Sequence, residues 1–414
     1  MNGWLLVILA IIAFGYLLDC TITLLTLRAL RPELPAGFED VYDVDKYARS
    51  QNYTKTRTCF ALVVSTVTTS ATLIFLMADG FDRLDLFARS FGYGQIGTGL
   101  IFLGILALLV YLLGLPFSIY STFVIEARFG FNKTTPTTFL LDLFRAVLLS
   151  VLLGGPLLAL LLWFFEIAGS FAWLYSWACV VFFSILVQFL APVLIFPLFN
   201  KFSPLEEGKL RDEILAYAKR ERFGIQGIFT MDGSKRSLKL NAFFTGFGRF
   251  RKIVFYDTLL NQLEIDEVVT ILAHEMGHFK HKHIRIMILA SILQTGVMFY
   301  FLSLLLNNPR LFAALDMTHV SVYASLVLFG FLYTPVNTVV SILFNCLSRQ
   351  HEFEADAYAV RTTGKTVQFI NGLKKLCQSN LTNLTPHPAV VFLEYTHPPV
   401  AARIRAVQRL AEGN

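Results

Sequence analysis

Long apolar stretches alternate with polar segments along the whole chain. Seven of these stretches reach the length of about 20 residues that a helix needs to cross a bilayer. They lie near 4–26, 58–77, 99–125, 139–167, 171–199, 284–306 and 321–347. The pattern therefore predicts a multi-span membrane protein with seven transmembrane helices.

The two most polar segments, 200–283 and 348–414, are predicted to fold outside the membrane. The first contains a helix-like run at 205–222, then two strand-like runs at 227–231 and 252–257 with 241–244 between them. A second, amphipathic helix follows at 266–279. The second consists of helices interrupted at 385–388 and 397–399. The expected fold is an all-α membrane bundle with a small β-sheet outside the bilayer.

The composition agrees with this architecture. Hydrophobic residues make up 55% of the 414 residues, and charged residues make up 15%, against about 25% in an average soluble domain. Such a chain is neither disordered nor an ordinary soluble enzyme. The 5 cysteines are scattered and never form a CxxC pair, which argues against a disulfide framework and against a cysteine-based zinc site.

The basic residues predict an orientation in the membrane. Of the 35 Lys and Arg residues, 30 lie in four segments that would share one side with the C-terminus: 27–57, 126–138, 200–283 and 348–414. The opposite loops hold only Arg83, Arg89 and Arg310. Since basic loops stay in the cytoplasm, the N-terminus is expected outside and the C-terminus inside.

Several polar side chains fall within the predicted spans: Asp19, Asp142, Arg145, Gln188, Gln294 and Asn337. Charges that face lipid are costly, so these groups are expected to face the interior of the bundle or one another. Asp142 and Arg145 are spaced i, i+3 and could pair on one helix. Pro156, Pro192 and Pro335 are expected to kink their spans.

The clearest chemical signal is the pentad His274-Glu275-Met276-Gly277-His278, an H-E-x-x-H motif. Positions i and i+4 of a helix share a face, so both imidazoles can bind one ion. Glu275 is turned away from the two ligands but can reach a water at the metal. The alternative is a helix with ordinary surface histidines, and the buried character of residues 268–273 argues against it.

Two histidines need a third protein ligand, and the run 351–356 is the obvious source. Glu352 and Asp356 are spaced i, i+4 and share a face, whereas Glu354 points elsewhere. One of the pair can bind the metal while the other orients a ligand histidine. His281 and His283 alternate with lysines and are expected at the membrane surface rather than on a metal.

With these motifs, the chain resembles the type I CAAX prenyl endopeptidases, integral-membrane zinc proteases that cleave after a prenylated cysteine. Four further motifs agree with the resemblance: 129–133, 237–247, 252–260, and His397-Pro398-Pro399 with Arg403 six residues after the histidine. The resemblance covers nearly the whole chain. It implies a seven-helix barrel around a large water-filled chamber, with a zincin-like catalytic domain at its cytoplasmic end.

The resemblance also implies roles for single residues. His274, His278 and Glu352 would bind one Zn²⁺, and Glu275 would be the general base. Asp356 would support the site from behind the ligands. His397 and Arg403 would help to bind substrate and steady the oxyanion, and Asn241 would lie on a strand that holds the peptide.

Four segments follow from this reading: transmembrane helices 1–5 in 1–199, a cytoplasmic catalytic segment in 200–283, helices 6 and 7 in 284–347, and a C-terminal segment in 348–414 that completes the zinc site. The expected partners are the lipid bilayer and a peptide or prenylated protein, with no nucleic acid; no pattern specifies an oligomeric state. The short loop 307–320 favours a bacterial inner membrane, or the endoplasmic reticulum if the protein is eukaryotic.

Two other functions compete with this interpretation. A broader membrane-protein quality-control zinc protease would share the pentad, but relatives of that type have about four spans rather than seven. A transporter or channel would explain charges inside the membrane, but it would leave the pentad and Glu352 without a role.

Overall fold

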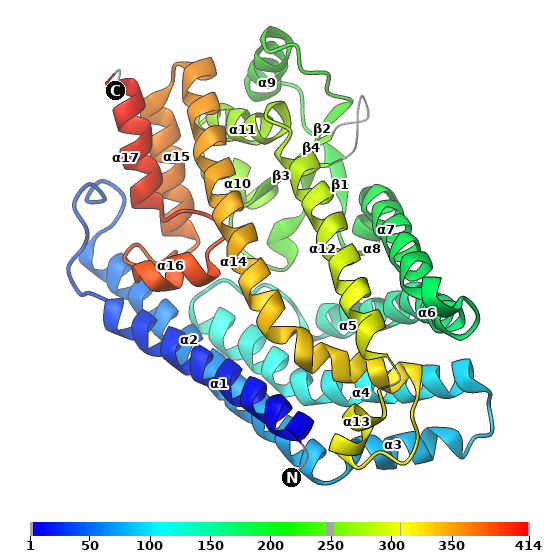
Figure 1. Cartoon of the computed structure of the whole chain (residues 1–414). Helices are drawn as coiled ribbons and strands as arrows, with labels where there is room; N and C mark the ends of the chain where they lie inside the picture. Colours follow the sequence, from blue (N-terminus) through cyan, green and yellow to red (C-terminus); the bar gives the residue numbers. More distant parts are fainter. Residues whose placement is uncertain (1–2, 246–251, 307, 413–414) are drawn as a thin grey trace.

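The computed structural model describes residues 3–245, 252–306 and 308–412 (Figure 1). Within these residues, seven helical spans are long and apolar enough to cross a membrane: Gly3–Ala29, Val44–Met77, Gln95–Glu126, Pro136–Ile167, Gly169–Phe199, His283–Leu305 and Val322–Thr363. The prediction of seven spans is therefore confirmed. Gly246 and Phe247 of the motif 237–247, and Asn307 of the loop 307–320, lie outside the described residues.

The first two spans, α1 (Gly3–Ala29) and α2 (Val44–Met77), are continuous helices, whereas the next three contain π-helical turns. The third span consists of α4 (Gln95–Tyr120) and η1 (Ser121–Glu126). The fourth span consists of α5 (Pro136–Leu149), η2 (Ser150–Gly154) and α6 (Gly155–Ile167). The fifth span consists of η3 (Gly169–Phe171), α7 (Ala172–Leu190), η4 (Ala191–Ile195) and α8 (Phe196–Phe199). Pro156 is the second residue of α6, just after η2, and Pro192 lies within η4. Proline has no backbone N–H and clashes with the preceding turn, which makes a widened turn favourable there.

The helices of the bundle bury little of their surface against one another. In the most apolar window of each span, between 0% and 11% of the residues are buried inside the protein. The lipid-facing side accounts for part of this exposure. A ring of helices around an open interior also leaves the inner faces of its helices exposed.

The seventh span, α14 (Val322–Thr363), is a single helix of 42 residues. Its first turn is capped by the Ser321 side chain, which accepts a hydrogen bond from the backbone of Ala324. It ends at Gly364, whose φ of 67° is a left-handed conformation that glycine adopts without strain. The predicted span boundary at residue 347 is not a break in the helix, so α14 runs without interruption through His351–Asp356.

A small mixed sheet lies beside the membrane helices at one end of the molecule (Figure 1). Its strand order is β1-β2-β4-β3, with bounds β1 (Phe202–Pro204), β2 (Gly227–Met231), β3 (Ala242–Thr245) and β4 (Lys252–Tyr256). Strands β2 and β4 are parallel, and β1 and β3 each pair antiparallel with their neighbour. Among the described residues, β3 is therefore an edge strand.

Helices outside the spans enclose a separate hydrophobic core at the same end of the molecule: α9 (Lys209–Arg220), α10 (Asp257–Leu260), α11 (Ile265–Lys280), α15 (Thr366–Ser379) and α17 (Val400–Ala411). The short helix α16 (Pro388–Glu394) packs instead against α14 and α1. Helix α11 is the centre of this core, because Val268, Leu272, Ala273 and Met276 are almost completely buried. It packs against α14 at Gly277, where an added Cβ would lie 2.9 Å from the Cα of Ala355. A glycine at this position allows the two helices to approach closely.

The loops at the opposite end contain structure that the hydropathy pattern did not predict: α3 (Gly80–Arg89), α13 (Pro309–Phe312) and η6 (Ala313–Leu315). Buried Asp85 of α3 accepts a hydrogen bond of 2.5 Å from the hydroxyl of Tyr323. It also forms an ion pair of 2.8 Å with Arg89. These contacts tie α3 to the start of α14.

The charged pair predicted within the fourth span has a different main partner. Asp142 accepts two hydrogen bonds, of 2.7 and 2.9 Å, from the guanidinium of Arg236, which lies just after η5 (Gly233–Lys235). Arg145 is 3.6 Å from the same carboxylate. The prediction that charges within the spans meet one another holds for this pair, but the stronger contact joins the fourth span to the segment before β3.

Candidate active site

Helix α11 is fixed at its start by a capping box. The side chain of Glu264 accepts a hydrogen bond from the third residue of the helix, and the Glu267 carboxylate accepts one of 2.8 Å from the backbone of Glu264. Lys375 of α15 is 2.8 Å from the same Glu267 carboxylate. These contacts fix the start of α11. Because one face of α11 is buried in the core, His274 and His278 lie on the face that contacts α14.

His274, His278 and Glu352 converge on one point between α11 and α14. The Nε2 atoms of the two histidines are 3.2 Å apart. Each lies close to one oxygen of Glu352, at 3.5 Å for His274 and 3.3 Å for His278. One ligand atom from each residue lies within 4.8 Å of the other two, which is an arrangement that can hold a metal ion.

Asp356 and Arg403 lie behind His274. The Nδ1 atom of His274 is 2.8 Å from Asp356, and Arg403 donates two hydrogen bonds, of 2.6 and 2.8 Å, to the same carboxylate. A third guanidinium nitrogen of Arg403 is 3.2 Å from Glu352. A carboxylate on Nδ1 sets the tautomer that leaves Nε2 free for a metal, so Asp356 orients His274.

One carboxylate oxygen of the cluster has no hydrogen-bond donor among the described residues. The Oε2 atom of Glu352 is buried and accepts no hydrogen bond within the described part of the chain, although Arg403 lies close to it. A buried carboxylate oxygen without a hydrogen bond is costly, and here the ion pair with Arg403 offsets only the charge. Two imidazoles and one carboxylate that still has this oxygen without a hydrogen bond form a donor set that fits Zn²⁺.

Glu275 lies at the same site but outside the set of candidate metal ligands. Its side chain lines a cavity of about 550 Å³ together with His274, His278 and Glu352. Burial raises the pKa of Glu275, while the neighbouring histidines act in the opposite direction. A carboxyl group with a raised pKa is a better proton acceptor than an ordinary surface glutamate, which suits a general base.

The same cavity collects the residues expected to bind substrate: Asn241, His397 and Arg403. Asn241 is exposed and directly precedes the edge strand β3. His397 is also exposed, with its Nε2 atom 3.4 Å from Glu352. Desolvation of its ring at the cavity wall lowers the pKa of His397, which favours the neutral ring. The guanidinium of Arg403, by contrast, is mainly occupied by Asp356 and Glu352.

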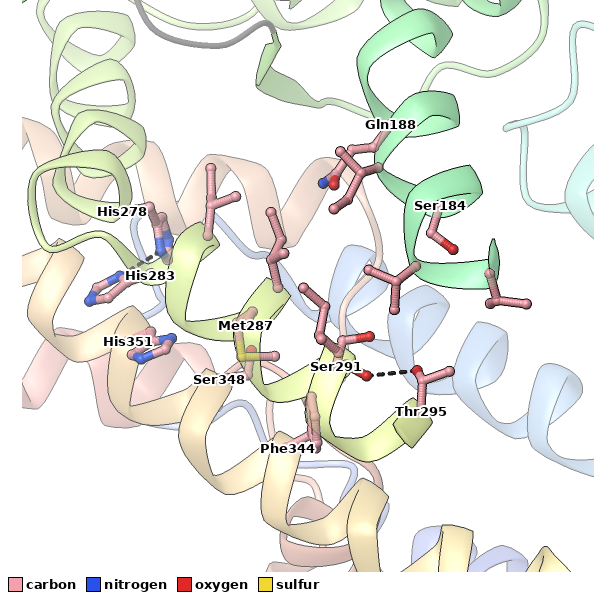
Figure 2. Close-up of a pocket in the computed structure, with 16 residues that line it drawn as sticks. Ser184, Gln188, His278, His283, Met287, Ser291, Thr295, Phe344, Ser348 and His351 are labelled. Carbon is pink, nitrogen blue, oxygen red and sulfur yellow. Dashed lines mark hydrogen bonds between the residues drawn. The ribbon is translucent and has the colours of Figure 1, made fainter. Parts of the chain in front are cut away.

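His283 does not lie at the surface, where the sequence analysis predicted it. The expectation of a surface position is wrong for this residue, since His283 is only 3% exposed. Its Nδ1 atom is 3.0 Å from Nδ1 of His278, as Figure 2 shows, and its Nε2 atom is 2.9 Å from Glu354. His281 is exposed, as expected.

The position of His283 depends on a turn between α11 and the next helix, which the periodicity of the sequence does not predict. In a continuous helix, residues 278 and 283 would be five apart and would point in different directions. Helix α11 ends at Lys280, however, and Lys282 adopts a left-handed conformation with φ of 61°. This turn starts helix α12 (His283–Leu305) and returns His283 to the side of His278.

A second cavity, of about 530 Å³, lies between α7 and α12 (Figure 2). Its lining combines aliphatic side chains, such as Ile284, Met287 and Ile288, with polar ones, among them Ser184, Gln188, Ser291 and Thr295. His278 and His283 close one end of it. The two cavities therefore share His278 as a wall. One lies next to Glu275, and the other lies among the membrane spans that contain α7, α12 and α14.

Comparison with known proteins gives matches along the whole chain. Residues 24–201 match the family model described as CAAX prenyl protease N-terminal, five membrane helices, and residues 204–411 match that of peptidase family M48. The chain is 35% identical to a CAAX prenyl protease 1 homolog of Arabidopsis thaliana, covering 95% of this chain and 94% of that protein. It is 32% identical to CAAX prenyl protease 1 of Saccharomyces cerevisiae, covering 92% and 89%.

A solved structure gives the same answer for the fold. The crystal structure of S. mikatae Ste24p superposes with a TM-score of 0.93 at 30% sequence identity. The match covers 98% of this chain and 99% of that chain. The helical bundle, the small sheet and the helices around them are therefore shared along the full length.

Proposed function

Since the chain belongs to peptidase family M48, and within that family to the CAAX prenyl proteases, we propose that it cleaves prenylated proteins near the C-terminus with the groups gathered around His274, His278 and Glu352. It is a multi-pass membrane protein and a metallopeptidase. The observation that carries the proposed substrate is the meeting of the two cavities at His278.

We propose one Zn²⁺ per chain as the cofactor, held by His274, His278 and Glu352. Bound zinc would supply an acidified water and polarise the carbonyl of the scissile bond. Asp356 holds the tautomer of His274, and Arg403 holds both Asp356 and Glu352 in place. The position of the donor atoms is thus defined by α11, α14 and α17 together.

Glu275 acts as the general base in this proposal. It takes a proton from the attacking water and later delivers that proton to the leaving amine. His397, neutral and exposed to the cavity, donates a hydrogen bond to the oxyanion that forms on the carbonyl. Arg403 lines the same cavity and adds positive charge behind Glu352.

The peptide is proposed to lie along β3. An edge strand offers backbone donors and acceptors to an added strand, which gives affinity with little demand on sequence. Asn241 stands at the beginning of that edge, and its Oδ1 atom accepts a hydrogen bond of 2.9 Å from the backbone of Ala242. The residue is exposed, and its amide NH₂ group is proposed to hold one end of the peptide.

His397→Ala and Asn241→Ala should keep the metal and lose activity. Removal of an oxyanion donor lowers kcat by a factor of about 100–1,000, so His397→Ala should act mainly on kcat. Loss of the clamp in Asn241→Ala should also raise KM. Peptide-cleavage kinetics and elemental analysis measure both effects, and wild-type kcat/KM in both variants would refute these roles.

The cavity between α7 and α12 is proposed to receive the isoprenoid chain. Its volume is that of a site for a small ligand, and the side chains of Ile284, Met287 and Ile288 offer an isoprenoid chain apolar contacts. A prenylated cysteine carries its lipid on the residue whose carbonyl belongs to the bond that is cut. A lipid site and a catalytic site that share His278 as a wall meet that geometric requirement.

The test compares one peptide with and without its prenyl group. The prenylated peptide should have the higher kcat/KM, and Ser184→Trp, which fills the apolar cavity, should reduce this preference by about tenfold or more. Phe182→Trp is the matched control, because Phe182 is 69% exposed on the same helix and does not line the cavity. Equal rates for the two peptides in the wild-type protein would contradict the proposed substrate.

We further propose that the metal site faces the cytoplasm and the N-terminus faces outside, on the basis of the basic residues. The short loop 307–320 favours the inner membrane of a bacterium, with the endoplasmic reticulum as the alternative in a eukaryote.

Glycosylation reports this topology. Four acceptor sequences, at Asn52, Asn132, Asn380 and Asn383, all lie on the proposed inner side, so none should acquire a glycan in a eukaryotic membrane. Asp316→Asn creates an acceptor in an exposed turn on the opposite side, at a left-handed residue that asparagine tolerates. A mass shift on gels should appear only in this variant, and a glycan on any native site would invert the topology.

A further inference from the structure

We propose that His283, held by Glu354, is a positioning residue for the metal ligand His278. The inference rests on the proposed function, since it requires a metal on Nε2 of His278. It assigns a role in the site to two residues that lie outside the cluster of His274, His278 and Glu352.

The hydrogen-bond chain has one consistent arrangement of protons. A neutral imidazole carries one N–H, so metal binding through Nε2 of His278 places its proton on Nδ1. That N–H can donate across 3.0 Å to Nδ1 of His283, which must then carry its own proton on Nε2. This second N–H donates across 2.9 Å to Glu354, so the chain ends on a carboxylate.

The two metal-binding histidines then have equivalent support. His274 reaches the carboxylate of Asp356 directly, at 2.8 Å, and His278 reaches that of Glu354 through one intervening imidazole. Both carboxylates belong to α14, which also supplies Glu352. Metal-bound histidines commonly place their second nitrogen on such a partner, which fixes the tautomer and the ring orientation.

His283 is itself held firmly. Its ring stacks on His351 with centroids 3.9 Å apart and planes 8° from parallel, as Figure 2 indicates. Glu354 is held in turn by Gln350, which donates a hydrogen bond of 3.0 Å to its other oxygen. Lys282 takes a left-handed conformation at the turn that brings His283 to this place. Such conformations are uncommon for residues other than glycine and persist where the surrounding structure holds them.

A second cation is the competing interpretation of these side chains, since His281, His283 and Glu354 also have ligand atoms within 4.8 Å of one another. The chain described above uses both ring nitrogens of His283, which leaves none for a metal. Moreover, the rings of His281 and His283 stack at 15° rather than converging on a common point.

The experiment measures zinc affinity of the full-length protein by competition with a chromophoric chelator. His283→Leu should weaken zinc binding by about 10- to 100-fold. His283→Gln should recover most of the affinity, because an amide can accept from His278 and donate to Glu354. His281→Ala is the matched control, since it removes an exposed neighbouring histidine that does not contact His278, and it should match the wild type.

Glu354→Leu keeps the test decisive if His283→Leu fails to fold. The Glu354 side chain is 39% exposed, so its removal should be tolerated, and it should also weaken zinc binding. Wild-type affinity in Glu354→Leu and in a folded His283→Leu would overturn the inference. Two zinc ions per wild-type chain, with one lost in His283→Leu, would overturn it in favour of the second cation. Absence of zinc from the wild-type protein would instead count against the proposed function.

Discussion

Glu275→Gln is expected to abolish peptide hydrolysis while the protein keeps its zinc. Glutamine has the shape of glutamate but cannot accept a proton at neutral pH, and loss of a general base costs about 100- to 10,000-fold in rate. The metal should remain, since His274, His278 and Glu352 are untouched and Glu275 lies outside the set of three converging ligand atoms. Cleavage assays and elemental analysis on the same preparation measure both quantities.

Asp266→Asn is the matched control for this variant. It removes one negative charge from the first turn of the same helix, at a side chain that is 46% exposed and paired with Lys365. Activity and zinc content should both stay near those of the wild type. Normal turnover in Glu275→Gln, or loss of its zinc, would contradict the assignment of Glu275 as the base.

Glu352→Ala should lose the metal and, with it, all activity. The variant removes the only carboxylate of the proposed ligand set, and it also leaves Arg403 with one carboxylate partner fewer. Loss of the zinc removes the chemistry that the bound ion supplies, which is worth several kcal/mol of transition-state stabilisation. Zinc content after gel filtration, together with cleavage of a prenylated peptide, measures the outcome.

The wild-type protein supplies the control for this experiment. Treatment with a chelator should abolish its activity, and added zinc should restore it. The same zinc concentration should not restore Glu352→Ala. Full zinc content in Glu352→Ala would remove Glu352 from the ligand set and would point to another carboxylate.

The membrane spans could be predicted from the sequence because lipid enforces one simple rule. A spanning helix must satisfy its backbone internally and present apolar side chains over about 20 residues. The first span, predicted at 4–26, is observed at Gly3–Ala29, and the sixth, predicted at 284–306, is observed at His283–Leu305. Helix α3 was missed because it is short and amphipathic, with charged residues at Asp82, Arg83 and Asp85.

The candidate metal site was accessible to sequence reasoning for a similar reason. The spacing i, i+4 places His274 with His278, and Glu352 with Asp356, on shared helix faces. That rule needs nothing beyond a helix at each place. It could not state how α11 and α14 approach each other, which depends on the close contact at Gly277 and Ala355.

Contacts across turns and between distant segments could not be predicted from the sequence pattern. The position of His283 depends on the backbone conformation of Lys282, a residue type that gives no warning of a left-handed turn. Asp142 pairs with Arg236, 94 positions away, and no periodic pattern links the two. The sequence could predict that Asp142 avoids lipid, but not which arginine it would meet.

The long helix α14 has a consequence for where the enzyme can work. His274 and His278 precede the sixth span, and Glu352 follows the membrane-crossing part of the seventh. Any continuous fragment that holds all three must therefore include both spans. If the three residues are the proposed ligands, proteolysis would not release an active soluble enzyme. Turnover then stays confined to the membrane plane. A lipid-anchored substrate reaches the enzyme there by lateral diffusion. The rate of encounter depends on the number of enzyme and substrate molecules per unit area of membrane.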